Sequence, residues 1–100
     1  MALTDAQRER IYRLAQGERN YIRFFQYLSQ LQHNMKQSAV TVVENHSNLN
    51  RKSSLDLMRK IANIGVAEMH PGGGDQTSYL AWAEDVDIRE VGKSADRPLR

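Results

Sequence analysis

The chain has 100 residues, of which 40% are hydrophobic and 26% are charged, and its net charge is +2. A chain of this length forms one domain with a modest core, burying about two thirds of the surface that the unfolded chain exposes. Because there is no cysteine, disulfides, thiolate chemistry and zinc ribbons are excluded. No apolar run is long enough to span a membrane and no apolar leader opens the sequence, so we expect a cytoplasmic protein.

Apolar residues recur at helical spacing over residues 11–43. Tyr21, Leu28 and Met35 stand seven residues apart, which predicts one long N-terminal helix. Gly17 interrupts this pattern and costs about 1 kcal/mol relative to Ala inside a helix. We prefer an unbroken helix because the seven-residue phase continues across the glycine. The alternative is a helix up to Gln16, a turn at Gly17 and a second helix afterwards.

The segment 44–53 is rich in Asn, Ser and His and is predicted to be a loop, because such side chains compete with helical hydrogen bonds. Residues 40–43 are assigned to the end of the long helix, although their β-branched side chains also suit a strand edge. A helix-turn-helix is not predicted, because no short glycine turn joins two helices with a basic second member.

A second helix is predicted from Ser53, with an apolar face so wide that the helix should be buried. Pro71 and the glycines after it end that helix and form a flexible loop. A third helix, capped by Asp75 or Thr77, carries Trp82. Residues 87–91 fit either helix or strand. The predicted fold is therefore all-α, with a long helix packed against two shorter ones in residues 1–91 and a flexible tail at 92–100.

The sequence shows no catalytic or metal-binding motif. The histidines, at positions 33, 46 and 70, are too widely spaced to hold a metal together, and the acidic residues of 84–90 suit a solvated face. The glycines at 72–74 lack the spacing of a phosphate-binding loop, and Asp75 stands where that loop has its lysine. We therefore expect no enzymatic activity, no metal and no cofactor.

Two sets of residues are candidates for binding. An exposed X-Pro-Gly segment is the kind of prolyl bond that a cyclophilin-type prolyl isomerase engages. This candidate partner site consists of His70, Pro71, Gly72 and Gly73.

Basic side chains form the second set and suit nucleic acid or an acidic partner. The arginines of the N-terminal third, at positions 8, 10, 13, 19 and 23, supply most of them. The predicted contact residues are Arg19, Arg23, Arg51 and Lys52.

The long apolar stripe exceeds what two shorter helices can cover, which favours a protein partner or a homodimer. With its small size, its helices and Pro71 in a glycine-rich loop, the chain resembles the lambdoid-phage anti-RecBCD accessory proteins. This resemblance implies binding to the host RecBCD helicase-nuclease in the host cytoplasm, and no catalysis. The predicted function is thus a non-enzymatic modulator of a larger host protein. The alternative is a small nucleic-acid-binding protein that uses its N-terminal arginines.

Overall fold

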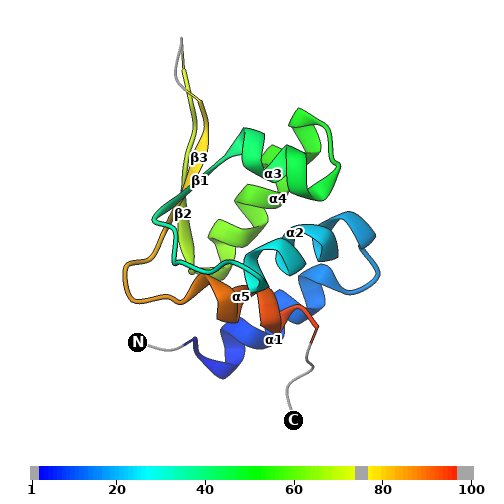
Figure 1. The fold of residues 1–100 in the computed structure, drawn as a ribbon, viewed down its shortest axis with the longest axis vertical. Helices are drawn as coiled ribbons and strands as arrows, with labels where there is room; N and C mark the ends of the chain where they lie inside the picture. Colours follow the sequence, from blue (N-terminus) through cyan, green and yellow to red (C-terminus); the bar gives the residue numbers. More distant parts are fainter. Residues whose placement is uncertain (1–2, 74–76, 97–100) are drawn as a thin grey trace.

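A computed structural model describes residues 3–73 and 77–96 of the chain. In these residues, five helices accompany one three-stranded antiparallel sheet with the strand order β1-β3-β2 (Figure 1). Along the chain the elements are α1 (Asp5–Ala15), α2 (Arg19–Ser29), β1 (Gln37–Ala39), α3 (Val40–Ser47), α4 (Arg51–Ile64), β2 (Ala67–His70), β3 (Tyr79–Trp82) and α5 (Ile88–Ser94). The all-α prediction is wrong.

The predicted third helix is the strand β3, at the centre of the sheet. Its residues alternate between half-buried and buried, which is the period of a strand, but four residues are too few to reveal this period in the sequence. Trp82 is buried, and its indole N–H donates to Ser38 Oγ of β1 at 2.8 Å. The buried middle helix ends earlier than predicted, because Gly65 adopts a left-handed conformation with φ at 95°. The next residues form β2.

The predicted long N-terminal helix is broken at Gly17, whose φ of 79° is incompatible with a helix. The preferred unbroken helix is therefore wrong, and the alternative of two helices is confirmed. The apolar stripe is divided among several elements, and its large members Phe24, Phe25 and Leu28 are fully buried in the core. A single exposed stripe, on which the expectation of a protein partner rested, is not present in the described residues.

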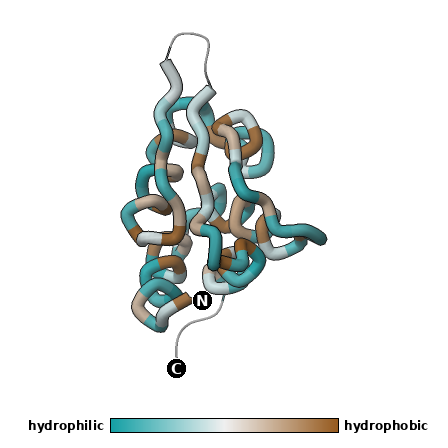
Figure 2. The backbone as a smooth tube through the Cα atoms, turned by 90° about the vertical axis from the view of Figure 1, so that its left-hand side faces the viewer, coloured by the Kyte–Doolittle hydropathy of each residue, from teal (hydrophilic) through white to brown (hydrophobic). Residues whose placement is uncertain are grey.

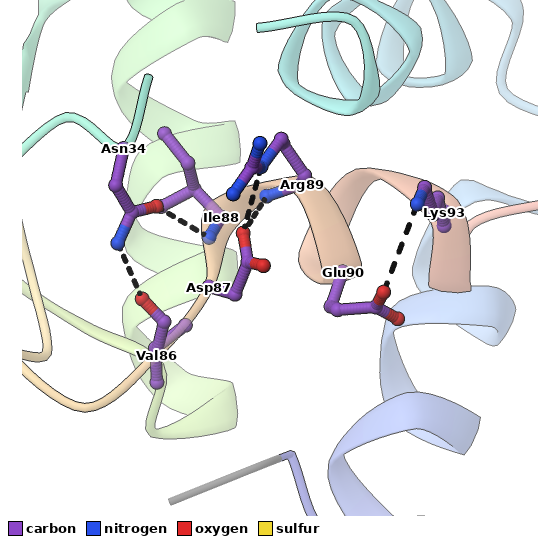
Figure 3. Close-up of polar contacts among 7 residues, drawn as sticks. All are labelled: Asn34, Val86, Asp87, Ile88, Arg89, Glu90 and Lys93. Atoms are coloured by element: carbon purple, nitrogen blue, oxygen red, sulfur yellow. Dashed lines mark hydrogen bonds and ion pairs between the residues drawn. The ribbon is translucent and has the colours of Figure 1, made fainter. Parts of the chain in front are cut away.

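Residues 87–91, which fit either helix or strand in the sequence, form the N-cap and the first turn of the helix α5. Asp87 caps this helix by accepting a hydrogen bond from the Arg89 backbone N–H at 3.0 Å. Asn34, just before β1, holds the same turn from outside: its side chain donates to the Val86 carbonyl at 3.1 Å and accepts from the Ile88 N–H at 3.0 Å (Figure 3). Residues 92–94 belong to the packed domain, contrary to the predicted tail, and residues 97–100 lie outside the described part.

A close backbone approach joins α5 to α2 in the core. Gly92 is buried, and a Cβ atom at this position would overlap the Phe25 carbonyl oxygen and the backbone of Ser29. Only glycine lets the two helices approach this closely. The two helices pack beside α1 at the end of the molecule opposite the far end of the β2–β3 hairpin (Figure 1), while α4 packs against the sheet. Figure 2 shows the hydrophobic residues of the helices spread over several elements.

Gly92→Ala should lower the free energy of unfolding by about 2 kcal/mol, because the new methyl group meets backbone atoms that cannot rotate away. For a domain of this size, this corresponds to a fall in Tm of roughly 10 °C. The matched control is Gly73→Ala, since nothing lies within 4 Å of a Cβ atom there. Thermal unfolding followed by circular dichroism measures both, and equal Tm values would contradict the packing role of Gly92.

The acid stability of the fold should depend partly on Asp87. Burial raises the pKa of its carboxyl, but hydrogen bonds from the Arg89 backbone and guanidinium outweigh burial, so the net pKa is lowered. A lowered pKa in the folded state stabilises the fold at neutral pH, and this contribution is lost as the pH falls through the lowered pKa, below about pH 4. In urea unfolding, Asp87→Asn should be less stable than the parent at pH 7. The difference should shrink toward pH 3, and a constant difference would argue against this linkage.

Candidate nucleic-acid interface

The helices α3 and α4 form a helix-turn-helix, which was not predicted from the sequence. Helix α3 has 8 residues, α4 has 14, and residues 48–50 connect them. Asn48 adopts the left-handed conformation, with φ at 63° and ψ at 28°, and its N–H donates to the Glu44 carbonyl at 3.0 Å. Asparagine here takes the place of the expected glycine, because its short polar side chain tolerates this conformation.

Polar residues of the predicted loop hold this turn together. Asn50 caps α4 by accepting a hydrogen bond from the Ser53 N–H at 2.8 Å. The buried Ser47 hydroxyl accepts from the Leu49 N–H at 3.2 Å. A salt bridge of 2.8 Å joins Arg51 to Glu44 across the turn. The polarity that suggested a loop thus reflects capping chemistry at two helix ends, which a sequence pattern does not distinguish from a loop.

One exposed line of side chains runs along α4, which we name the α4 outer face. Its members follow one another at spacings of four, three and four residues, and so lie on one side of the helix. The opposite side carries Leu57, Met58 and Ile61, which are fully buried. The α4 outer face consists of Lys52, Asp56, Arg59 and Asn63.

The cations on α4 differ in how they are engaged. Lys60 lies beside the outer face, 3.0 Å from Asp56 Oδ2, and donates to Tyr21 Oη at 3.2 Å. The hydrogen bond with Asp56, and then that with Tyr21, raise the pKa of Lys60, which therefore stays protonated at neutral pH. By contrast, Lys52 and Arg59 make no side-chain hydrogen bond or ion pair with any residue that the structure describes. Their charges are available to an external anion.

The remaining predicted basic residues are distributed over other helices. Arg19 and Arg23 are exposed on α2, around a shallow depression that also contains Ile22, and no ion pair within the described ranges joins them to α4. Arg10 of α1 does reach α4, because its guanidinium donates to the Asn63 carbonyl at 3.0 Å. With Arg13 it borders a second depression between α1 and α4. Of the predicted arginines, Arg10 and Arg13 thus lie beside the C-terminal end of α4, whereas Arg19 and Arg23 lie on α2.

The predicted partner segment lies at the far end of the β2–β3 hairpin. His70 ends β2, and its ring stacks on Tyr79 of β3 with centroids 4.9 Å apart. The next residues, 71–73, are exposed, and the Gly72 N–H donates to Ser78 Oγ at 2.8 Å. Gly74 and Asp75, which the sequence analysis included in the glycine-rich loop, lie outside the described residues. The segment belongs to a hairpin rather than to a helix connection, and binding of a prolyl isomerase at Pro71 stays a prediction.

The hairpin is nearly free of cations. No Lys or Arg occurs from residue 67 to residue 81, and Figure 2 shows the far half of the hairpin in pale colours of intermediate hydropathy. It runs along one side of the helices toward the end of the molecule where α3 lies (Figure 1). Any electrostatic attraction of this region to an anion must therefore come from α4 and the helices beside it.

The histidines and acidic residues considered in the sequence lie apart from one another or are engaged in the fold. Among residues 3–73 and 77–96, no three His, Asp or Glu side chains gather as metal ligands. His46 of α3 stacks on the Tyr27 ring, with centroids 3.6 Å apart. In the acidic segment 84–90, Asp87 caps α5 and Glu90 pairs with Lys93 at 3.8 Å. The same ranges contain no helix of the length and apolarity that a membrane span requires.

No protein-family model, no curated protein and no solved structure matches this chain. The resemblance to anti-RecBCD proteins therefore gains no support from these comparisons.

The helix-turn-helix should depend on the backbone of Asn48. Asn48→Ala should lower the free energy of unfolding by about 1 kcal/mol, because a Cβ without a compensating polar group is strained at positive φ. Asn48→Gly should match the parent or exceed it, since glycine adopts this conformation without strain. Urea unfolding compares the three proteins. If alanine were as stable as glycine at this position, the left-handed turn would not be a structural requirement.

Proposed function

We propose that this protein binds duplex DNA through its helix-turn-helix, with α4 lying in the major groove. The observation that carries this proposal is the exposed α4 outer face, on which Lys52 and Arg59 carry charges that no described residue neutralises. A helix of 14 residues is about 21 Å long, and the major groove of B-DNA admits an α-helix. In helix-turn-helix proteins the second helix enters this groove.

The order of elements supports the same role. A helix, a short strand, a helix-turn-helix and a β-hairpin follow one another in α2, β1, α3, α4 and β2–β3. This is the element order of winged helix-turn-helix domains, many of which bind DNA, and the argument is one of fold-level analogy. The hairpin directly follows α4 after a two-residue connection at residues 65–66, and β2 packs against α4. A duplex bound by α4 would therefore meet the hairpin as well.

Neutral groups would make the hairpin's contacts with DNA. Backbone N–H groups and hydroxyls are common donors to phosphate oxygens, and they position a protein on the duplex without a charge of their own. Gly73 and Thr77, both exposed, offer such groups at the far end of the hairpin. The cations on α4 would supply the salt-dependent part of the affinity.

The predicted role as a modulator of a larger host protein stays a prediction. Its main argument was an uncovered apolar stripe on one long helix, and in the structure that stripe is divided and mostly packed. Binding to RecBCD, a prolyl isomerase at Pro71 and a homodimer are likewise untested, as is the absence of enzymatic activity. A DNA-binding role fits the cytoplasmic location expected from the sequence, or the host cytoplasm if a phage encodes the protein.

The test compares two double variants with the same change in charge. Lys52→Ala with Arg59→Ala should weaken binding to a fluorescent 30-base-pair duplex by about tenfold or more at 100 mM salt, and should reduce the salt slope by about two. Arg19→Ala with Arg23→Ala also removes two exposed cations, but from α2, and should weaken binding less than about threefold. Fluorescence anisotropy at several salt concentrations measures both.

Equal losses in the two variants would indicate diffuse attraction to a basic surface, and would contradict a site on α4. If the parent protein bound no duplex at all, the proposal would fail. Pull-down from a nuclease-treated bacterial lysate would then test the host-protein alternative, with recovery of a DNA-repair complex as its expected result.

A further inference from the structure

Asp56 is the unexpected member of the α4 outer face. It lies between Lys52 and Arg59 on the exposed side of the helix, and its side chain is 53% exposed. A helix that only attracted phosphates would gain from a cation or a neutral residue here, because a carboxylate repels the DNA backbone. At the centre of this face, Asp56 is therefore better suited to contact a hydrogen-bond donor than a phosphate.

The surroundings of Asp56 leave one carboxylate oxygen open. Lys60 lies 3.0 Å from Oδ2 and is itself held by the hydroxyl and the ring of Tyr21, with 5.4 Å between Nζ and the ring centroid. Lys60 thus compensates the charge of Asp56 and limits its rotation. Oδ1 has no hydrogen bond or ion pair within the described part of the chain.

An open carboxylate oxygen accepts hydrogen bonds and cannot donate them. In the major groove, the N4 amino group of cytosine is the donor that Asp and Glu characteristically engage, whereas guanine presents only acceptors there. Adenine presents its N6 donor beside the N7 acceptor, a pair that suits an amide and repels a carboxylate. Phosphates offer no donor to a carboxylate. The base edges are therefore the part of a duplex that this group can bind.

We infer that α4 reads base sequence, and that Asp56, held by Lys60, determines specificity by accepting a hydrogen bond from cytosine N4. This inference rests on the proposed function. Arg59 and Lys52 stand about 4.5 Å and 6 Å from Asp56 along the helix axis, which corresponds to one or two base-pair steps of 3.4 Å. These two cations contact the phosphates that flank this base pair. The recognised site should thus contain a cytosine at one position, on either strand.

A simpler interpretation is that Asp56 only supports the helix. An exposed pair at i and i+4 stabilises a helix by a small amount and carries no information about base sequence. The two interpretations differ in one observable, since only the specificity role predicts that a substitution at Asp56 changes which sequences are bound.

The experiment selects duplexes from a randomised library with the parent protein and with three variants, followed by affinity measurements on the selected sites. The parent should enrich cytosine at one position and bind it about tenfold more tightly than the other bases. Asp56→Ala should lose this preference, and Asp56→Asn should shift it toward adenine, because an amide pairs with adenine N6 and N7. Glu84→Gln is the control, since this exposed carboxylate lies outside α4 and the variant changes the charge by the same amount.

The outcomes separate the inference from the proposed function. A cytosine preference that is lost or shifted only in the Asp56 variants supports the inference. If all four proteins bind duplex DNA with the same sequence preference, or with none, the inference is overturned while DNA binding stands. If the parent binds no duplex, both fail. Circular dichroism of each variant confirms that the exposed substitutions leave the fold intact.

Discussion

The left-handed backbone of Asn48 is the constraint on which the candidate interface depends. It ends α3 and reverses the chain within three residues, so that Asn50 is placed to cap the next helix. The burial of Leu57 and Met58 then fixes which side of α4 faces inward, and the opposite side is left exposed. One backbone conformation and one line of buried residues thus decide where the charged side chains of α4 are presented.

Charge neutralisation, rather than the number of charges, distinguishes the surfaces of this protein. Half of its described Lys and Arg residues have an acidic neighbour within 4.0 Å, for example Arg13 beside Glu9 at 2.8 Å. Such exposed pairs add little to stability and also weaken long-range attraction to an anion. The net charge of +2 therefore does not show which surface of the molecule attracts an anion. The relevant quantity is the position of the cations that have no such neighbour: Lys52 and Arg59 share one face of α4, and Arg19 and Arg23 lie together on α2.

The sequence predicted a helix over most of α4 and, as an alternative, the break at Gly17. It predicted that the α4 helix would be buried, whereas one side of it is exposed. It did not predict the sheet, because β1 and β3 have only three and four residues and are stabilised by partners far away in the chain, such as Ser38 and Trp82. It also missed the helix-turn-helix. A search for a glycine turn could not recognise Asn48, and the capping residues around it have the composition of a loop. Of the predicted contact residues, Lys52 lies on the proposed interface, whereas Arg51 is engaged by Glu44.

The buried side and the exposed side of α4 consist of different residues with different roles. The buried side makes the contacts with the core, and the α4 outer face makes few contacts with the rest of the chain. Substitutions on the outer face can therefore accumulate without a large cost in folding free energy, whereas changes on the buried side are constrained by packing. A protein built in this way can acquire a new binding preference by a few exposed substitutions while its fold stays the same.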